Sequence, residues 1–162
     1  MLWLIGMMGS GKSTVGAGVA ERLGVEFLDM DTLHEQRWGS IASQWVFDGE
    51  AVFREREERL VVELAAHPTP AVVATGGGCV TSSLAVDLMR ASGTVVWLKA
   101  ATDTLAARLL EAPQRPVLQE RVLEDIHLER LERYGTAAHH VVNTDDLSQE
   151  SVIEEVAALW RP

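Results

Sequence analysis

The pattern of apolar and polar positions divides the chain into short apolar runs separated by longer amphipathic stretches. A short apolar run is typical of a strand buried on both faces, and apolar residues recurring every three or four positions are typical of a helix with one buried face. Strands are predicted at Leu2–Ile5, 26–28, Ala71–Ala74, 94–98 and 139–142. Helices are predicted at Lys12–Leu23, 32–38, Ile41–Phe47, 50–66, 84–91, 102–110, 121–134 and 149–160.

This alternation predicts an α/β fold, a five-stranded parallel sheet with helices on both faces. Right-handed crossovers place the loops that follow the strands at one edge of the sheet, where ligands usually bind. A chain of 162 residues, 47% of them hydrophobic, is expected to form a single domain spanning 1–162. The segment 112–121, APQRPVLQER, has two prolines and several polar residues, and it is predicted to be a movable surface loop that acts as a lid.

The first fourteen residues carry the clearest chemical signal. Gly6, Gly11, Lys12 and Ser13 have the G-x-x-x-x-G-K-[ST] spacing, between a predicted strand and a predicted helix. In that context the backbone amides and the helix N-terminus form an anion site, the lysine reaches the β- and γ-phosphates of a nucleotide, and the serine hydroxyl binds Mg²⁺. A glycine-rich turn without a ligand is the alternative, and the coincidence of motif and context disfavours it.

Two carboxylates, Asp29 and Asp31, follow the second predicted strand. In an extended segment, residues two apart project to the same side, so both are expected to face one spot at the ligand edge of the sheet. Asp29 is predicted to help hold Mg²⁺ through a metal-bound water, and Asp31 to orient or deprotonate an attacking hydroxyl. The alternative is that both are ordinary caps of the next helix.

Two further groups follow in the chain. Gly76, Gly77 and Gly78 come after a predicted buried strand, and they are interpreted as the floor of a small polar substrate site. Arg54 and Glu57 lie three apart on one predicted helix. Arg54 could bind a substrate carboxylate while Glu57 fixes its rotamer, but spacing alone favours an ordinary surface ion pair.

The C-terminal half contributes arginines at positions 108, 115 and 130. Phosphoryl transfer needs such positive charge, because negative charge spreads over the oxygens of the transferred group. Arg115 lies in the proline-bounded segment and is expected to arrive at the site on closure and to exclude water.

Composition narrows the class of protein. A formal net charge of −10 argues against a general nucleic-acid or anionic-membrane surface. Cys79 is the only cysteine, which excludes an intramolecular disulfide and favours a reducing compartment. The apolar start is too short for a signal peptide, and no apolar run approaches transmembrane length. We therefore expect a cytoplasmic protein with neither nucleic-acid nor membrane partners.

The motifs GMMGSGKSTVG, FLDMD, GEAVFREREE, ATGGG, QRPVL and RLERYGTAA, in this order and spacing, resemble the shikimate kinase family. The resemblance extends from Leu2 to about Val156 and implies a P-loop fold like that of nucleoside-monophosphate kinases. It implies transfer of the γ-phosphoryl group of MgATP to the 3-hydroxyl of shikimate, which gives shikimate 3-phosphate and ADP, a step toward chorismate and the aromatic amino acids. Mg²⁺ is the implied cofactor, ATP and shikimate are the implied ligands, and a monomer is expected.

The resemblance also implies roles for single residues. The implied shikimate-binding residues are Asp31, Arg54, Gly76, Gly77, Gly78 and Arg130, of which the two arginines hold the carboxylate. The implied ATP-binding residues are Gly9, Ser10, Gly11, Lys12, Ser13, Thr14, Arg108 and Arg115, with Arg108 near adenine and Arg115 on the phosphates. Ser13 and Asp29 are the implied metal-side residues, and the catalytic set is Lys12, Asp31 and Arg115.

Two other classes of protein fit the phosphate loop. One is another small-molecule kinase of the same fold, such as a gluconate or nucleoside-monophosphate kinase. The pair Arg54 and Arg130 fits a carboxylate-bearing substrate, and the three glycines favour shikimate over either of these acceptors. The other is a non-catalytic ATP-binding module that regulates a partner, which the joint presence of Lys12, Asp31 and Arg115 disfavours.

Some positions depart from the usual pattern of the family. The lid is short and rich in glutamate, and the loop 144–149 contains two aspartates and no arginine, so no contact with the base is assigned there. Trp45 either lines the substrate pocket or packs, and packing is expected. His139 and His140 match no family site.

Overall fold

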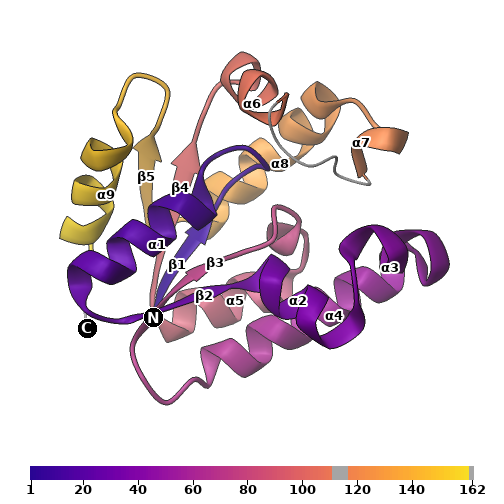
Figure 1. The fold of residues 1–162 in the computed structure, drawn as a ribbon, viewed down its shortest axis with the longest axis horizontal. Coiled ribbons are helices and arrows are strands. Elements are labelled where there is room, and N and C mark those ends of the chain that lie inside the picture. The colour runs from indigo at the N-terminus through magenta and orange to yellow at the C-terminus, as the bar shows by residue number, and fades with distance from the viewer. Residues whose placement is uncertain (111–116, 161–162) are drawn as a thin grey trace.

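A single parallel sheet forms the centre of the molecule. The structure, a computed structural model, describes residues 1–110 and 117–160. The strands run in the order β2-β3-β1-β4-β5, and all four neighbouring pairs are parallel (Figure 1). Their bounds are β1 Leu2–Ile5, β2 Glu26–Asp29, β3 Ala71–Ala74, β4 Thr94–Lys99 and β5 His140–Asn143. The predicted five-stranded sheet is therefore confirmed, with strand ends that differ by at most one residue.

Helices cover both faces of this sheet, as predicted. They are α1 Lys12–Leu23, α2 Met30–Trp38, α3 Ile41–Phe47, α4 Gly49–Ala65, α5 Ser83–Ser92, α6 Thr102–Leu109, α7 Val117–Glu120, α8 Leu123–Ala137 and α9 Gln149–Ala158, with a 3₁₀ turn, η1, at Cys79–Thr81. Within the described residues, none of these helices has the length and hydrophobicity that a membrane span requires.

The alternation of side chains along β1 explains the two layers. Leu2 and Leu4 pack with apolar residues of α1 and α9 on one face. Trp3 and Ile5 pack on the other face with residues of α4, α5 and α8. All four residues are fully buried, because β1 is the central strand and successive side chains of a strand point to opposite faces.

Most helices differ from the prediction by one to three residues at an end, and three differences bear on the site. The helix predicted at 32–38 begins at Met30. The helix predicted at 121–134 ends at Ala137, because Tyr134 and Ala137 are both buried and packing continues the helix past an exposed glycine. The segment predicted as a loop at 112–121 contains α7, whose first residue, Val117, is buried; most of the rest of that segment lies outside the described residues.

Candidate active site

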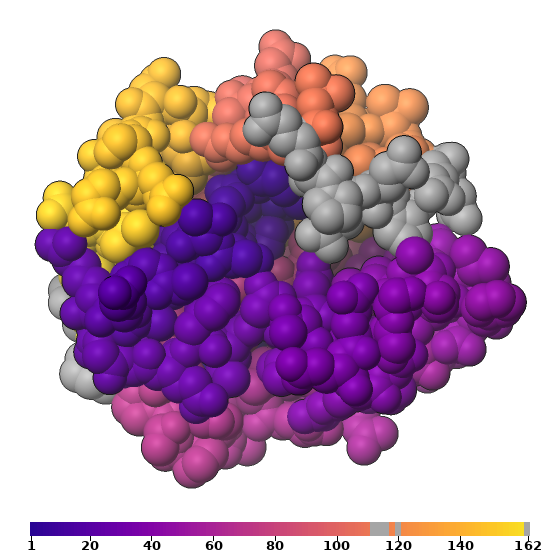
Figure 2. Space-filling model, in the orientation of Figure 1, coloured from indigo at the N-terminus to yellow at the C-terminus, as the bar shows by residue number. Residues whose placement is uncertain are grey.

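A cavity of about 370 Å³ opens at the ends of β1, β2 and β3. Figure 2 shows the molecule hollowed above the indigo N-terminal segment, between the segments coloured salmon to yellow and those coloured purple. The lining includes every predicted site residue except two. Ser10 lines a neighbouring cavity of about 290 Å³, and Arg115 lies outside the described residues.

The loop between β1 and α1 forms one wall of the cavity. Gly9 and Gly11 have φ angles of 81° and 90°, which glycine adopts without the clash that a Cβ causes. Gly11 is the N-cap of α1, and a residue without a side chain leaves the first N–H groups of this helix open toward the cavity. Lys12 Nζ donates to the carbonyls of Gly6 and Met7 at 2.8 and 2.9 Å. This wall therefore has the geometry of an anion site.

The first carboxylate of the DMD segment lies beside the phosphate loop. Ser13 Oγ donates to Asp29 Oδ2 at 2.5 Å. Asp29 is also the N-cap of α2, because its Oδ1 accepts the backbone N–H of Thr32 at 3.0 Å. The capping and functional interpretations of Asp29 are therefore compatible.

The prediction that Asp29 and Asp31 lie in one extended segment is wrong. Asp29 ends β2, whereas Asp31 lies in the first turn of α2, so the two residues do not share an extended segment. The cap at Asp29 starts the helix two residues earlier than predicted. Both side chains nevertheless line the same cavity, because the short turn from β2 into α2 faces its interior.

The donor groups at this point suit a magnesium ion that is carried by a nucleotide. In residues 1–110 and 117–160, no group of three or more His, Cys, Asp or Glu side chains could hold a metal on its own. The Ser13 hydroxyl and the Asp29 carboxylate are hard oxygen donors at the edge of the cavity. Mg²⁺ prefers such oxygens and commonly takes one or two from the protein and the rest from phosphates and water. The residues present fit that arrangement.

Arg54 and Glu57 form a partly buried ion pair. Arg54 Nη1 donates to Glu57 Oε2 at 2.5 Å, and the side chain of Glu57 is 6% exposed. Nε and Nη2 of Arg54 donate to Glu50 Oε1 at 3.2 and 3.0 Å. Burial raises the pKa of Glu57, and the Arg54 guanidinium opposes this shift. Because both residues line the cavity, the interpretation as a surface ion pair, which spacing favoured, is wrong.

The three glycines are packed against this ion pair and the phosphate loop. A Cβ at Gly76 would collide with the Glu57 carboxylate, and one at Gly78 with the Arg54 guanidinium. A Cβ at Gly77 would lie 3.4 Å from the backbone nitrogen of Met8. Any larger residue at positions 76 or 78 would therefore displace one member of the ion pair.

Arg130 reaches the cavity from α8. It is 3% exposed, and its Nη1 donates to the carbonyl of Gly77 at 3.2 Å. Its Nε has no hydrogen-bond partner in the described part of the chain. A buried guanidinium with an unpaired donor at a cavity is suited to an anionic ligand.

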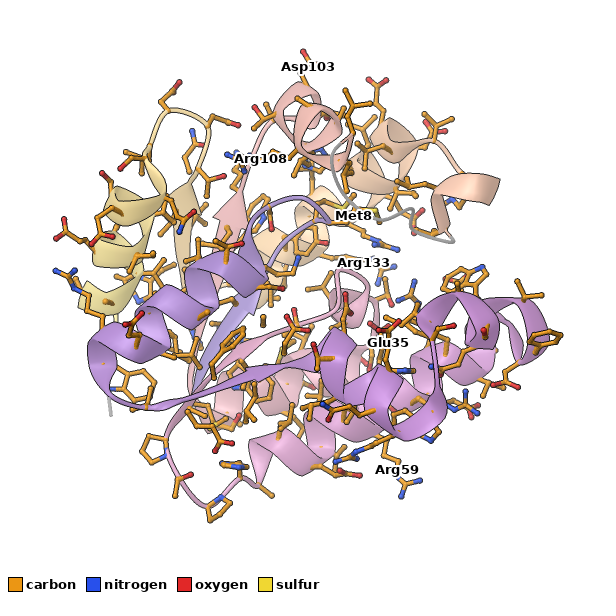
Figure 3. The ribbon with its side chains drawn as sticks, in the orientation of Figure 1. Met8, Glu35, Arg59, Asp103, Arg108 and Arg133 are labelled. Carbon is orange, nitrogen blue, oxygen red and sulfur yellow. The ribbon has the colours of Figure 1, made fainter. Side chains whose placement is uncertain are left out.

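Arg108 joins the loop after β5 to the phosphate loop. Its Nη1 donates to Thr144 Oγ1 at 3.1 Å and its Nη2 to the Thr144 carbonyl at 2.9 Å. Figure 3 shows the Arg108 side chain pointing from α6 toward this loop. The Asp145 carboxylate accepts the backbone N–H of Ala101, the residue before α6, at 2.9 Å, and this hydrogen bond lowers the pKa of Asp145. Asp145, to which no contact with the base was assigned, therefore has a structural role.

Sequence reasoning missed several residues of the site. Phe53 and Thr75 line the cavity, and Tyr134 lies behind it with its hydroxyl on Gly77. Trp45, expected only to pack, does both: its ring lies 5.5 Å from that of Phe53, and it also lines the cavity. The position of Tyr134, four residues after Arg130 on one helix, was the available signal, since such residues share a face.

Comparisons with known proteins identify the family. The shikimate kinase family model matches residues 8–160. The shikimate kinase of Aliivibrio fischeri is 40% identical over 161 residues, covering 96% of this chain and 92% of that protein. The shikimate kinase of Vibrio parahaemolyticus is 39% identical, with 98% and 94% covered. Among solved structures, the shikimate kinase of Acinetobacter baumannii in complex with shikimate has a TM-score of 0.90 at 32% identity, covering 98% of this chain and 90% of that chain.

These matches span both walls of the cavity, and they agree with the predicted fold and with the predicted class of enzyme, an ATP-dependent kinase. The chain therefore belongs to the shikimate kinase family.

Proposed function

We propose that this protein transfers the γ-phosphoryl group of MgATP to the 3-hydroxyl of shikimate, with the donor on the loop after β1 and the acceptor between α4 and α8. The main support for this proposal is that the phosphate loop and two cations from different helices, Arg54 and Arg130, line the same cavity of about 370 Å³. In a chain of net charge −10, such a local pair of cations is what an anionic acceptor requires.

On the donor side, residues Gly9 to Thr14 would hold the phosphates through their backbone N–H groups, and Lys12 would exchange its two carbonyl partners for phosphate oxygens. Ser13 and Asp29 would hold Mg²⁺, which neutralises charge on the β- and γ-phosphates when it is bound. Arg108 would lie beside the nucleotide, where it braces the loop after β5. Arg115, outside the described residues, is proposed to reach the phosphates.

On the acceptor side, the planar guanidinium groups of Arg54 and Arg130 would hold the shikimate carboxylate. The three glycines would let the ring of the substrate approach their backbone closely, because none of them carries a side chain of its own. Asp31 lines the cavity between this wall and the phosphate loop, where it would orient or deprotonate the attacking hydroxyl. In-line transfer then requires only positioning and charge stabilisation.

The remaining expectations belong to the same proposal. We propose that the chain forms one domain over 1–162 and acts as a cytoplasmic monomer without nucleic-acid or membrane partners. The strong negative charge supports the absence of polyanionic partners, because it repels phosphate backbones and anionic headgroups.

The test is a coupled assay that measures ADP release from MgATP with and without shikimate, with mass spectrometry of the product. We expect turnover only with shikimate, a product heavier by one phosphoryl group, and loss of turnover when EDTA removes Mg²⁺. Gluconate and AMP are the control acceptors. ADP release that does not depend on shikimate, or no turnover at all, would contradict the proposal.

A further inference from the structure

Two side chains of α8 donate to a single carbonyl oxygen of the cavity wall. Tyr134 Oη donates to the Gly77 carbonyl at 2.6 Å, and Arg130 Nη1 donates to the same oxygen at 3.2 Å. Both donors come from one helix face, because the residues are four apart. A carbonyl oxygen has two lone pairs, so this pair of donors satisfies Gly77 completely.

Tyr134 is the permanent donor of the two. Its side chain is fully buried, and its ring stacks on Trp97 with ring centroids 5.5 Å apart and an interplanar angle of 22°. Burial raises the pKa of Tyr134, so the hydroxyl keeps its proton at physiological pH. No part of this side chain lines the cavity, so a ligand would not contact it.

Arg130 also interacts with the side chain of Tyr134, and its Nη1 has two competing acceptors. In the structure its Nη1 is on the Gly77 carbonyl, but the proposed acceptor site needs the same guanidinium for the substrate carboxylate. The Gly77 carbonyl is partly buried, and the cost of about 1–3 kcal/mol for a fully buried carbonyl without a donor is the upper bound for its loss of both donors. The backbone of the phosphate loop limits how far Gly77 can move, because Met8 N and Gly6 O lie 3.4 and 3.5 Å from the position that a Cβ of Gly77 would take.

We propose that Tyr134 is a positioning residue for the acceptor substrate. Its hydroxyl satisfies the Gly77 carbonyl, which releases the Arg130 guanidinium for the carboxylate. This inference rests on the proposed function, and it concerns a residue that does not touch the substrate.

The first test is Tyr134→Phe, which removes the hydroxyl and keeps the ring on Trp97. The Gly77 carbonyl and the substrate carboxylate then compete for Arg130, so we expect the KM for shikimate to rise about five- to tenfold. The kcat should stay within about twofold, and the KM for MgATP should not change, because the phosphate loop keeps its contacts.

Ser92→Ala is the matched control. It removes a part-buried hydrogen bond, from Trp3 Nε1 to Ser92 Oγ at 3.1 Å, together with the one that Ser92 Oγ donates to the Leu88 carbonyl at 2.7 Å, and neither Trp3 nor Ser92 lines the cavity. We expect a decrease in thermal stability similar to that of Tyr134→Phe, with both KM values unchanged. A rise in the KM for shikimate of equal size in both variants would mean that Tyr134 acts only through general stability.

A double-mutant cycle separates positioning from independent binding. Shikimate affinity is measured by calorimetry for the wild type, Tyr134→Phe, Arg130→Ala and the double variant. Because Tyr134 acts through Arg130, we expect its removal to weaken binding less than about twofold once Arg130 is absent. The same fold-change in both backgrounds, or an unchanged KM in Tyr134→Phe, would overturn this inference. Failure of the wild type to use shikimate would instead overturn the proposed function.

Discussion

The two walls of the cavity are built in different ways. The donor wall is built mainly from one contiguous segment, residues 6–14, with Asp29 and Arg108 beside it, and most of its proposed ligands are backbone N–H groups held by glycines with positive φ. The acceptor wall combines side chains of α2, α4 and α8 with the loop after β3, from Asp31 to Arg130. A local segment can form its site from its own backbone, whereas the acceptor wall exists only after four elements have packed.

The cationic side chains of the two walls also have different hydrogen-bond partners. Lys12 lies on the carbonyls of its own loop. Arg54 is held by the buried carboxylate of Glu57, which in turn accepts a weak hydrogen bond from Cys79 Sγ at 3.6 Å. Damage to the donor wall should therefore reduce the rate of the chemical step, whereas damage to the acceptor wall should weaken substrate binding and reduce stability together.

The largest effect is expected at the donor wall, for Lys12→Met. Loss of a cation aimed at the charge that develops in the transition state should lower kcat about 10³-fold. We expect only a small change in stability, because the two hydrogen bonds of Lys12 Nζ described above go to carbonyls of its own loop. The measurement is the coupled assay together with thermal unfolding.

The chain offers one matched control, since Lys99 is its other lysine and lies over the Trp97 ring, outside the cavity. Lys99→Met should keep kcat within about twofold. Equal losses of activity in the two variants would show that net charge, and not position, explains the result.

The next effect is expected at the acceptor wall, for Arg54→Ala. We expect a rise in the KM for shikimate of about 100-fold, because a charged hydrogen-bonding partner of the carboxylate is lost. The buried Glu57 is left without its cation, so the free energy of unfolding at pH 7 should fall by about 2 kcal/mol. Arg59→Ala, on the same helix but 72% exposed in its side chain, is the control and should change neither quantity. An unchanged KM in Arg54→Ala would contradict the carboxylate assignment.

A smaller effect is expected for Gly78→Ala. The φ angle of Gly78 is −94°, so alanine is allowed by the backbone, and the only obstacle is the collision of its Cβ with the Arg54 guanidinium. We expect the KM for shikimate to rise about tenfold as Arg54 is displaced. Gly135→Ala, at a helical position where a Cβ meets nothing within 4 Å, should leave KM unchanged and stabilise the protein by up to about 1 kcal/mol.

The smallest effect concerns pH. His34 is 1% exposed, between Trp38 and Phe53 behind the acceptor wall, and burial lowers its pKa from 6.5. Below pH 6.5 the unfolded chain takes up a proton that the folded chain does not, so stability is lost as pH falls toward the folded pKa. Between pH 7.5 and 5.5, urea unfolding should show the wild type losing about 1 kcal/mol more than His34→Leu.

His140→Gln changes an exposed histidine and serves as the control for that measurement. It should follow the wild type across the same pH range. If His34→Leu also lost stability in parallel with the wild type, the pH dependence would come from other groups.

Much of the fold could be predicted because it depends on local patterns. Apolar runs long enough for one strand predicted β1 and β3 to the residue, and periodicity predicted α1 and α3 to the residue. The errors fell where a tertiary contact or a cap moved a boundary. The N-cap at Asp29 makes α2 begin two residues before the predicted start. Packing of Tyr134 and Ala137 extends α8 beyond Gly135.

The acceptor wall could be predicted only in part. An i, i+3 pair such as Arg54 and Glu57 has the same spacing at the surface and at a cavity, so spacing by itself favoured the wrong environment. The structure shows that the pair lies at the cavity wall, because a Cβ at Gly76 or Gly78 would collide with it. These glycines are more than eighteen positions away from the pair in the sequence. The spacing of Tyr134 and Arg130 could have placed Tyr134 on the same helix face, but its partner is the backbone carbonyl of Gly77, which only the tertiary structure shows.

By itself, the sequence determined the sheet, its helices and the phosphate loop, because strand burial, helical periodicity and glycine-dependent turns depend on neighbouring residues. Only the tertiary structure decided that Arg54 and Arg130 face one cavity and that Glu57 is buried beneath it. The physical reason is that burial and orientation depend on what packs against a side chain, and those neighbours lie in distant parts of the chain.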